Sequence, residues 1–213
     1  MQLDPRNWSP LTLAQAAAEM RGFPARWWIA GGWALELFLA QVAPSASGAP
    51  RRLHEDTDVL ILRRDQLAAQ QHLAHWRLFK TQQPEPPHLA PWPQGEFLGP
   101  PINDVWLRDE PHAGPWRFQL MLMEAEGERW VYRRKPTIGG PLAELGLTTP
   151  EGLPYLAPEI QLLYKSRTGR PKDEQDFQTV HPHLDPTRRQ WLQNSLREQY
   201  PQGHPWAEAL AHL

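Results

Sequence analysis

The chain has 213 residues, of which 40% are apolar and 22% are charged, and its formal net charge is -2. This length and composition exclude a disordered chain and fit one large domain, or one domain with a modest second lobe. The near-neutral charge gives no indication of nucleic-acid or membrane binding, and the lack of cysteine excludes disulfides, thiolate zinc sites and cysteine nucleophiles.

Two further features of the sequence concern location and packing. No apolar stretch approaches the roughly 20 residues that span a bilayer, and the N-terminus lacks a basic segment followed by an apolar one, so we expect a cytoplasmic protein. The 24 prolines predict short elements joined by long ordered connections, and the 11 tryptophans predict a core and clefts lined by large flat side chains.

The N-terminal third predicts a helix followed by a strand, a glycine turn and a second helix. We expect the first helix over residues 11–20, with Ser9 as its cap and Pro10 at its start. A short apolar run over residues 27–30 predicts a buried strand. Gly31 and Gly32 break that strand, and residues 33–39 predict a helix with an apolar face.

The middle of the chain predicts alternating strands and loops. Residues 56–62 predict a strand, residues 65–73 a helix capped by Asp65, and residues 76–79 another strand. Residues 80–101 contain seven prolines and two glycines and predict an extended loop, with Trp92, Phe97 and Leu98 buried.

Two more strands and a mostly helical final third follow. Residues 105–107 and 117–124 predict strands, residues 126–128 a hairpin turn, and residues 130–133 the returning strand. Residues 158–165, 174–180, 186–199 and 205–213 predict helices, several of them starting near a proline.

Asp56 and Asp58 form the first candidate site. Residues two apart on a strand point to the same face, so the two carboxylates are expected side by side. Adjacent carboxylates repel unless a cation neutralises them, and magnesium prefers such oxygen ligands and links them to substrate phosphates. The alternative is a solvated aspartate pair at the start of a strand.

Gly31 and Gly32 form the second candidate site. A glycine pair between a strand and a helix lets backbone amides face outward, and the helix N-terminus adds partial positive charge, so the turn is suited to phosphate oxygens. The alternative is a tight turn that needs positive φ. The order of the two motifs, glycines first and aspartates downstream, favours the functional interpretation.

Several segments in this order resemble a known family. Residues 29–39 (IAGGWALELFL) and 54–59 (HEDTDV), together with residues 130–134, 155–165 and 170–177, are similar to the aminoglycoside 2''-adenylyltransferase-like branch of the DNA polymerase β nucleotidyltransferase superfamily. The resemblance runs from about residue 27 to the C-terminus.

The resemblance implies an α+β fold, with a mixed sheet and packed helices in a nucleotidyltransferase-like domain over residues 1–150 and a helical portion over residues 151–213. It implies transfer of a nucleoside monophosphate from a magnesium-bound nucleoside triphosphate to a hydroxyl group of a small molecule. The expected co-substrate is ATP, with two Mg²⁺ ions at Asp56 and Asp58. Neither a membrane nor a nucleic acid is an expected partner, and the oligomeric state stays open.

One position departs from the family pattern. The superfamily supplies a third carboxylate from a later strand, and the matching position here is Gln119, a neutral side chain that cannot act as a base. Glu124 differs from Gln119 by an odd number of positions, so a regular strand points it to the other face. Lys165 and Lys172 are expected to contact the triphosphate, with solvated helix faces as the alternative.

These observations leave three hypotheses. The first is a magnesium-dependent nucleotidyltransferase. The second is a nucleotide-binding or partner-binding module that has lost catalysis, as Gln119 suggests. The third is an interaction protein that binds partners through the proline-rich segment bearing Trp92 and Phe97.

Overall fold

The computed structural model describes residues 3–45, 49–84, 87–109, 114–167 and 169–212. Two compact units make up the chain: the first comprises Met1–Ile29 and His54–Ala125, and the second comprises Ala30–Leu53 and Glu126–Leu213. No helix in the described residues is both long and apolar enough to cross a membrane. The division into residues 1–150 and 151–213 that the sequence suggests stays a prediction.

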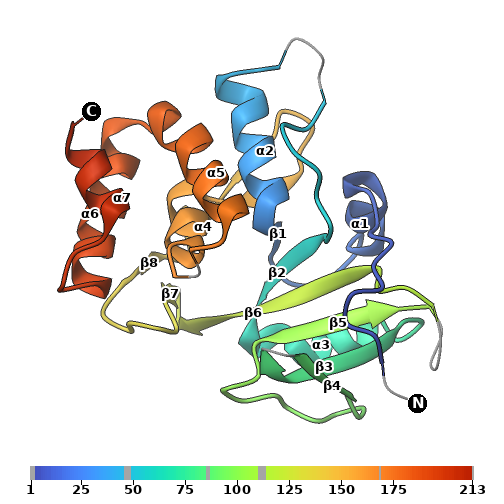
Figure 1. Cartoon of the computed structure of the whole chain (residues 1–213). Coiled ribbons are helices and arrows are strands. Elements are labelled where there is room, and N and C mark those ends of the chain that lie inside the picture. Colours follow the sequence, from blue (N-terminus) through green and yellow to red (C-terminus); the bar gives the residue numbers. More distant parts are fainter. Residues whose placement is uncertain (1–2, 46–48, 85–86, 110–113, 168, 213) are drawn as a thin grey trace. The chain divides into compact units, whose positions relative to one another are not determined.

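The first unit is a mixed sheet with two short helices. Its elements are α1 (Leu13–Glu19), β1 (Trp27–Ile29), β2 (Asp58–Leu62), a 3-10 turn (Arg63–Asp65), α3 (Gln66–His72), β3 (Arg77–Pro84), β4 (Pro87–Pro91), β5 (Asp104–Arg108) and β6 (Phe118–Glu126). The strand order is β4-β3-β5-β6-β2-β1. β2 runs parallel to β6, whereas the other pairs are antiparallel (Figure 1).

The central strands have their apolar side chains buried. Val59, Ile61, Val105 and Leu120 are fully inaccessible to solvent, and Leu122 is almost so. These branched side chains suit a pleated surface covered by other elements. In β6 the buried Phe118, Leu120 and Leu122 alternate with the half-buried Gln119 and Met121, so the strand predicted over residues 117–124 is confirmed.

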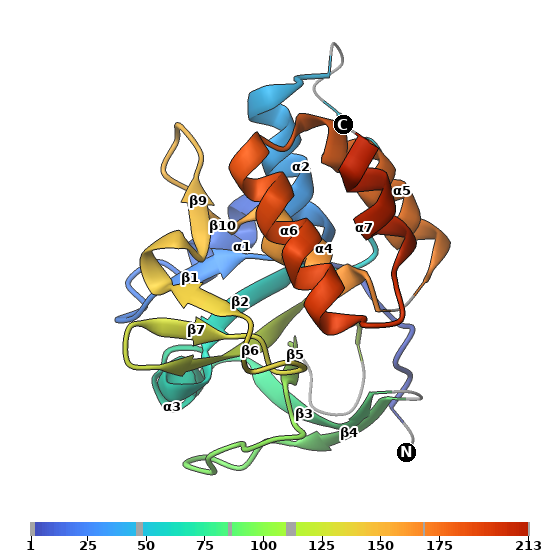
Figure 2. The same ribbon diagram turned by 90° about the vertical axis from the view of Figure 1, so that its left-hand side faces the viewer.

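The second unit is mostly helical. Its elements are α2 (Gly31–Val42), β7 (Arg129–Val131), β8 (Gly139–Pro141), a 3-10 turn (Leu142–Glu144), β9 (Gly146–Thr148), β10 (Pro154–Leu156), α4 (Pro158–Lys165), α5 (Pro171–Val180), a 3-10 turn (His181–His183), α6 (Pro186–Gln199), α7 (Pro205–Ala209) and a final 3-10 turn (Leu210–His212). β7 pairs with β8 and β9 with β10, both antiparallel. Helix α4 packs against α2, α5 and α6, and α6 packs against α7 (Figure 2).

The expected α+β class, with a mixed sheet and a helical final third, is confirmed. The predicted bounds of α4 and α6 match the structure, since each helix starts at a proline in its first turn. The turn after β6 is also confirmed, with Gly127 at φ 58°.

The start of the first helix was predicted wrongly. Thr12, not Ser9, caps α1, because Thr12 and Gln15 form a reciprocal capping box. Residues 8–11 are extended instead: the Ser9 N–H donates to Trp116 O at 3.0 Å and the Leu11 N–H to Arg117 O at 2.8 Å.

The loop predicted over residues 80–101 is also wrong in its first half, where β3 and β4 form a hairpin. β4 tolerates its prolines because it is an edge strand that pairs only with β3 in the described sheet. Trp92 and Leu98 are buried as expected, but Phe97 is 56% exposed. The buried Trp92 removes part of the basis for an interaction surface in this segment.

Candidate functional site

The glycine turn lies where the chain passes from β1 to α2. Helix α2 begins at Gly31 itself, two residues earlier than predicted, with Ala30 as its N-cap. Gly31 has φ 66°, a conformation that L side chains rarely adopt, so glycine is required here. Its N–H donates to Gln161 Oε1 at 2.8 Å, and both Gly31 and Gly32 are buried. The first amide of the predicted phosphate site therefore already has a partner within the second unit.

The aspartate pair lies at the start of β2. Asp58 is the first residue of the strand, and Asp56 precedes it in the connecting segment, so the strand is two residues shorter than predicted. Between them Thr57 is fully buried, and its Oγ1 donates to Leu11 O at 2.7 Å. Its carbonyl accepts from Gln119 N at 2.9 Å, which continues the pairing to β6. Asp56 and Asp58 are half-buried on either side of the buried Thr57, and the shared face of their carboxylates stays a prediction.

Gln119 lies beside the aspartate pair, as the family pattern implies. It is the register partner of Asp58 across the parallel β2–β6 pair. Directly paired residues share a face of a sheet, so Gln119 and Asp58 point to the same side. Glu124, further along β6, forms an ion pair with Arg63 and serves the strand end as expected.

Asp104 is a further acidic residue at this place that the sequence did not reveal. Gln119 Nε2 donates to Asp104 Oδ1 at 3.2 Å, and Asp104 on β5 is paired with Met121 of β6. The β5 strand was predicted to begin one residue later, at position 105, and its neighbour in the sheet could not be read from the chain. The available signal was the alternation of Asp104 and Trp106 with the buried Val105 and Leu107.

The β2–β6–β5 pairing brings together oxygen atoms of Asp58, Gln119 and Asp104, and oxygen is the ligand type that magnesium prefers. Within the part of the chain that the structure describes, no group of three or more His, Asp or Glu side chains is arranged to hold a metal ion. The residues therefore fit a magnesium ion that is held by a pair of carboxylates and by phosphate oxygens of a substrate, and not one whose ligands all come from the protein.

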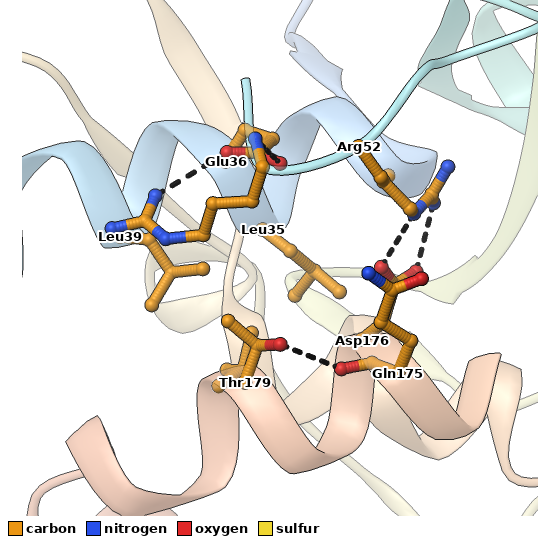
Figure 3. A pocket seen from close by; sticks show the side chains of 10 residues that line it. Leu35, Glu36, Leu39, Arg52, Gln175, Asp176 and Thr179 are labelled. Atoms are coloured by element: carbon orange, nitrogen blue, oxygen red, sulfur yellow. Dashed lines mark hydrogen bonds and ion pairs between the residues drawn. The ribbon is translucent and has the colours of Figure 1, made fainter. Parts of the chain in front are cut away.

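Lys165 is buried and engaged within the second unit. It is 7% exposed, and its Nζ lies 3.0 Å from Asp173 Oδ1 and 2.9 Å from Asp176 Oδ2. Arg52 forms a two-pronged pair with Asp176 at 2.7 and 2.9 Å (Figure 3). Arg170 lies 2.8 Å from Asp173.

This cluster of Arg52, Lys165, Arg170, Asp173 and Asp176 is an ion network. Burial raises the pKa of Asp176, but the hydrogen bond from Arg52 and the charge of Lys165 outweigh it and hold that pKa below its usual 3.8. The Asp176 carboxylate is thus ionised, and its negative charge stabilises the positive charge of Lys165. The predicted contact of Lys165 with a triphosphate stays a prediction, and so does that of Lys172, which lies half-buried in the first turn of α5.

Comparisons with known proteins give information on the fold of the chain alone. No protein-family model matches the chain, and no curated protein matches it. Among solved structures it is similar to "Antibiotic-Resistance Factor ANT(2'')-Ia", with a TM-score of 0.55 and 14% identity over 94% of this chain and 95% of that one. It also matches the Megavirus polyadenylate synthase with a TM-score of 0.41 and 12% identity, over 95% of this chain and 39% of that one, a likeness too low to support a conclusion. The first likeness shows that the chain has an α+β, nucleotidyltransferase-like fold.

Proposed function

We propose that the protein is a magnesium-dependent nucleotidyltransferase that transfers a nucleoside monophosphate, from ATP in the first instance, to a hydroxyl group of a small molecule in the cytoplasm. The observation that carries the proposal is that Asp58 is the register partner of Gln119 on β6, and that Gln119 is hydrogen-bonded to Asp104 on β5, with Asp56 two residues before Asp58. The nucleotidyltransferase-like fold supports it.

In this proposal Asp56 and Asp58 would hold magnesium, which would supply positive charge for the phosphate oxygens of the triphosphate. The Gly31 N–H already donates to Gln161, so the N–H groups left to bind phosphate oxygens are those of Gly32 and the N-terminus of α2. Lys165 and Lys172 supply positive charge toward the triphosphate. Positioning and electrostatics, rather than covalent chemistry, account for catalysis.

A second candidate function is a nucleotide-binding or protein-interaction module without turnover. It is favoured by Gln119, which occupies the register position beside Asp58 and whose amide is hydrogen-bonded to Asp104. A neutral amide neither accepts a proton nor balances a second cation. This candidate predicts that triphosphate and magnesium bind without release of pyrophosphate.

Pyrophosphate release separates the two candidates. Purified protein is incubated with magnesium, each nucleoside triphosphate and a panel of hydroxylated small molecules, and adducts of the acceptor are sought by mass spectrometry. Turnover that falls at least a hundredfold in Asp58→Asn supports the transferase. The matched control is Asp109→Asn, which changes an exposed carboxylate whose oxygen lies 3.6 Å from Arg117. Equal turnover in both variants would show that Asp58 takes no part in the reaction. Triphosphate binding without turnover in the native chain would favour the nucleotide-binding module.

A further inference from the structure

A cavity of about 550 Å³ lies wholly within the second unit. It is formed by β7, β8, the 3-10 turn after β8, β9 and the first turns of α4 and α6. Its volume falls in the range of about 300–1,000 Å³ that small-molecule sites occupy. None of Gly31, Gly32, Lys165 and Lys172 lines it, so it is distinct from the groups assigned to the nucleotide in this unit.

Two tryptophans form an aromatic corner of the cavity. The rings of Trp130 and Trp191 lie 5.8 Å apart between centroids, at 56° to each other. Trp130 is 1% exposed, and its Nε1–H has no hydrogen-bond partner. A buried indole N–H normally has an acceptor, so this donor is available to an oxygen atom of a ligand.

Gly140 lies close beside that donor. A Cβ atom added at Gly140 would lie 3.2 Å from Trp130 Nε1 and 3.7 Å from Cε2 of the same ring. Gly140 itself lines the cavity. A side chain at this position would therefore press against the indole edge, which glycine avoids.

The charged groups of the cavity are mainly acidic. Glu144, Glu159 and Asp185 line it together with one arginine, Arg188. Arg188 is bound to Glu159 Oε1 at 2.7 Å and to Asp185 Oδ2 at 2.9 Å. One cation against three carboxylates leaves two excess negative charges, which disfavours an anion in this cavity.

Glu159 is the buried acidic group of the cavity, whereas Glu144 and Asp185 are exposed. It is 7% exposed, and its second oxygen, Oε2, has no hydrogen-bond partner. Burial raises its pKa, an effect that Arg188 only partly offsets. An unsatisfied buried carboxylate oxygen is costly, and a cationic ligand would relieve that cost.

We propose that this cavity binds a small organic cation that also carries an oxygen acceptor. The ammonium group lies against the indole faces and Glu159 Oε2, where cation–π attraction and charge pairing act together. The oxygen accepts from Trp130 Nε1. The proposal is independent of nucleotidyl transfer.

The test is a titration of the full chain followed by the indole N–H signals of Trp130 and Trp191 in NMR spectra. The probes are choline and 4-methoxybenzylamine, two cations that carry an oxygen acceptor, each paired with a neutral compound of the same shape, 3,3-dimethyl-1-butanol and 4-methoxybenzyl alcohol; sodium sulfate serves as the anionic probe. We expect at least one cation to shift both signals and to bind at least tenfold more tightly than its neutral counterpart.

Two variants locate the site. Glu159→Gln keeps the oxygen that accepts from Arg188 and removes the charge, so cation affinity is expected to fall about tenfold. Gly140→Ala covers the indole edge and is expected to weaken binding of the cation and of its neutral counterpart alike. Asp109→Asn, an exposed carboxylate outside the cavity, is expected to leave binding unchanged.

Equal binding of cations and their neutral counterparts would overturn the proposal. So would no binding by any cation, tighter binding of sulfate, or cation binding that both cavity variants leave unchanged. If Glu159→Gln fails to fold, Gly140→Ala alone decides the location, and the comparison of choline with 3,3-dimethyl-1-butanol in the native chain still decides the charge requirement.

Discussion

Replacing Lys165 with methionine removes a buried positive charge that contacts two carboxylates. Its Nζ lies 3.0 Å from Asp173 and 2.9 Å from Asp176, and Asp173 is completely inaccessible to solvent. Breaking a buried ion pair from one side typically costs about 3–5 kcal/mol, because the remaining charge stays buried without compensation. Arg170 and Arg52 still pair with the two carboxylates, so we expect the free energy of unfolding to fall by about 3 kcal/mol, the lower end of that range.

The assay is urea unfolding, with Lys172→Met as the matched control. Lys172 lies in the first turn of α5 in the same unit and is half-buried, whereas Lys165 is 7% exposed. Its replacement is expected to cost about 1 kcal/mol or less. A loss for Lys165→Met no greater than for Lys172→Met would refute the reasoning that Lys165 stabilises the second unit.

The same network predicts the direction of the pH dependence. Because the pKa of folded Asp176 lies below its usual 3.8, this group stabilises the fold above pH 3.8 and the contribution is lost as the pH falls through its folded value. The difference in the free energy of unfolding between the native chain and Lys165→Met is therefore expected to shrink below pH 3.8. A difference that stays constant from pH 7 to the acid range would contradict this account.

Three further predictions concern other contacts. Trp92→Ala is expected to cost about 3–5 kcal/mol in urea unfolding, because Trp92 is 6% exposed, whereas Phe97→Ala, at a position 56% exposed, is expected to cost about 0.5 kcal/mol or less; equal losses would contradict the burial of Trp92. Arg63→Met is expected to raise hydrogen exchange over residues 98–103, because Arg63 donates to two carbonyls and one side chain there; unchanged exchange would count against that role. Gln161→Leu leaves the buried Gly31 N–H without its acceptor and is expected to cost about 1–3 kcal/mol by thermal unfolding; a neutral effect would mean that another acceptor replaces Gln161.

The elements that could be predicted from the sequence are those whose signals are local. Apolar runs and alternation marked the positions of β2 and β6, and prolines in the first turn marked α4 and α6. The shared face that the spacing of Asp56 and Asp58 suggests stays a prediction, because only Asp58 lies within the strand. Local chemistry was sufficient in these cases because neighbouring residues decide the outcome.

The remaining features depend on contacts between distant residues. The β3–β4 hairpin was missed because prolines argue against strands, except at an edge, and edges are a property of the whole sheet. Asp104 reaches Gln119 only through the β5–β6 register, and Gln161 reaches Gly31 from 130 positions away. Lys165 was predicted to face a ligand, but its position among two aspartates depends on how α4 and α5 pack.

Magnesium-dependent triphosphate binding tests the central claim most directly. Thermal unfolding is measured with ATP and then with each other nucleoside triphosphate at 100 times its dissociation constant, with and without magnesium, for the native chain, Asp56→Asn/Asp58→Asn and the control Asp109→Asn. We expect at least one triphosphate to stabilise the native chain and the control by about 2.7 kcal/mol, an effect that requires magnesium and disappears in the double variant. Stabilisation that persists in the double variant, or that is absent from the native chain with every nucleoside triphosphate, would contradict the assignment of Asp56 and Asp58 as the metal site.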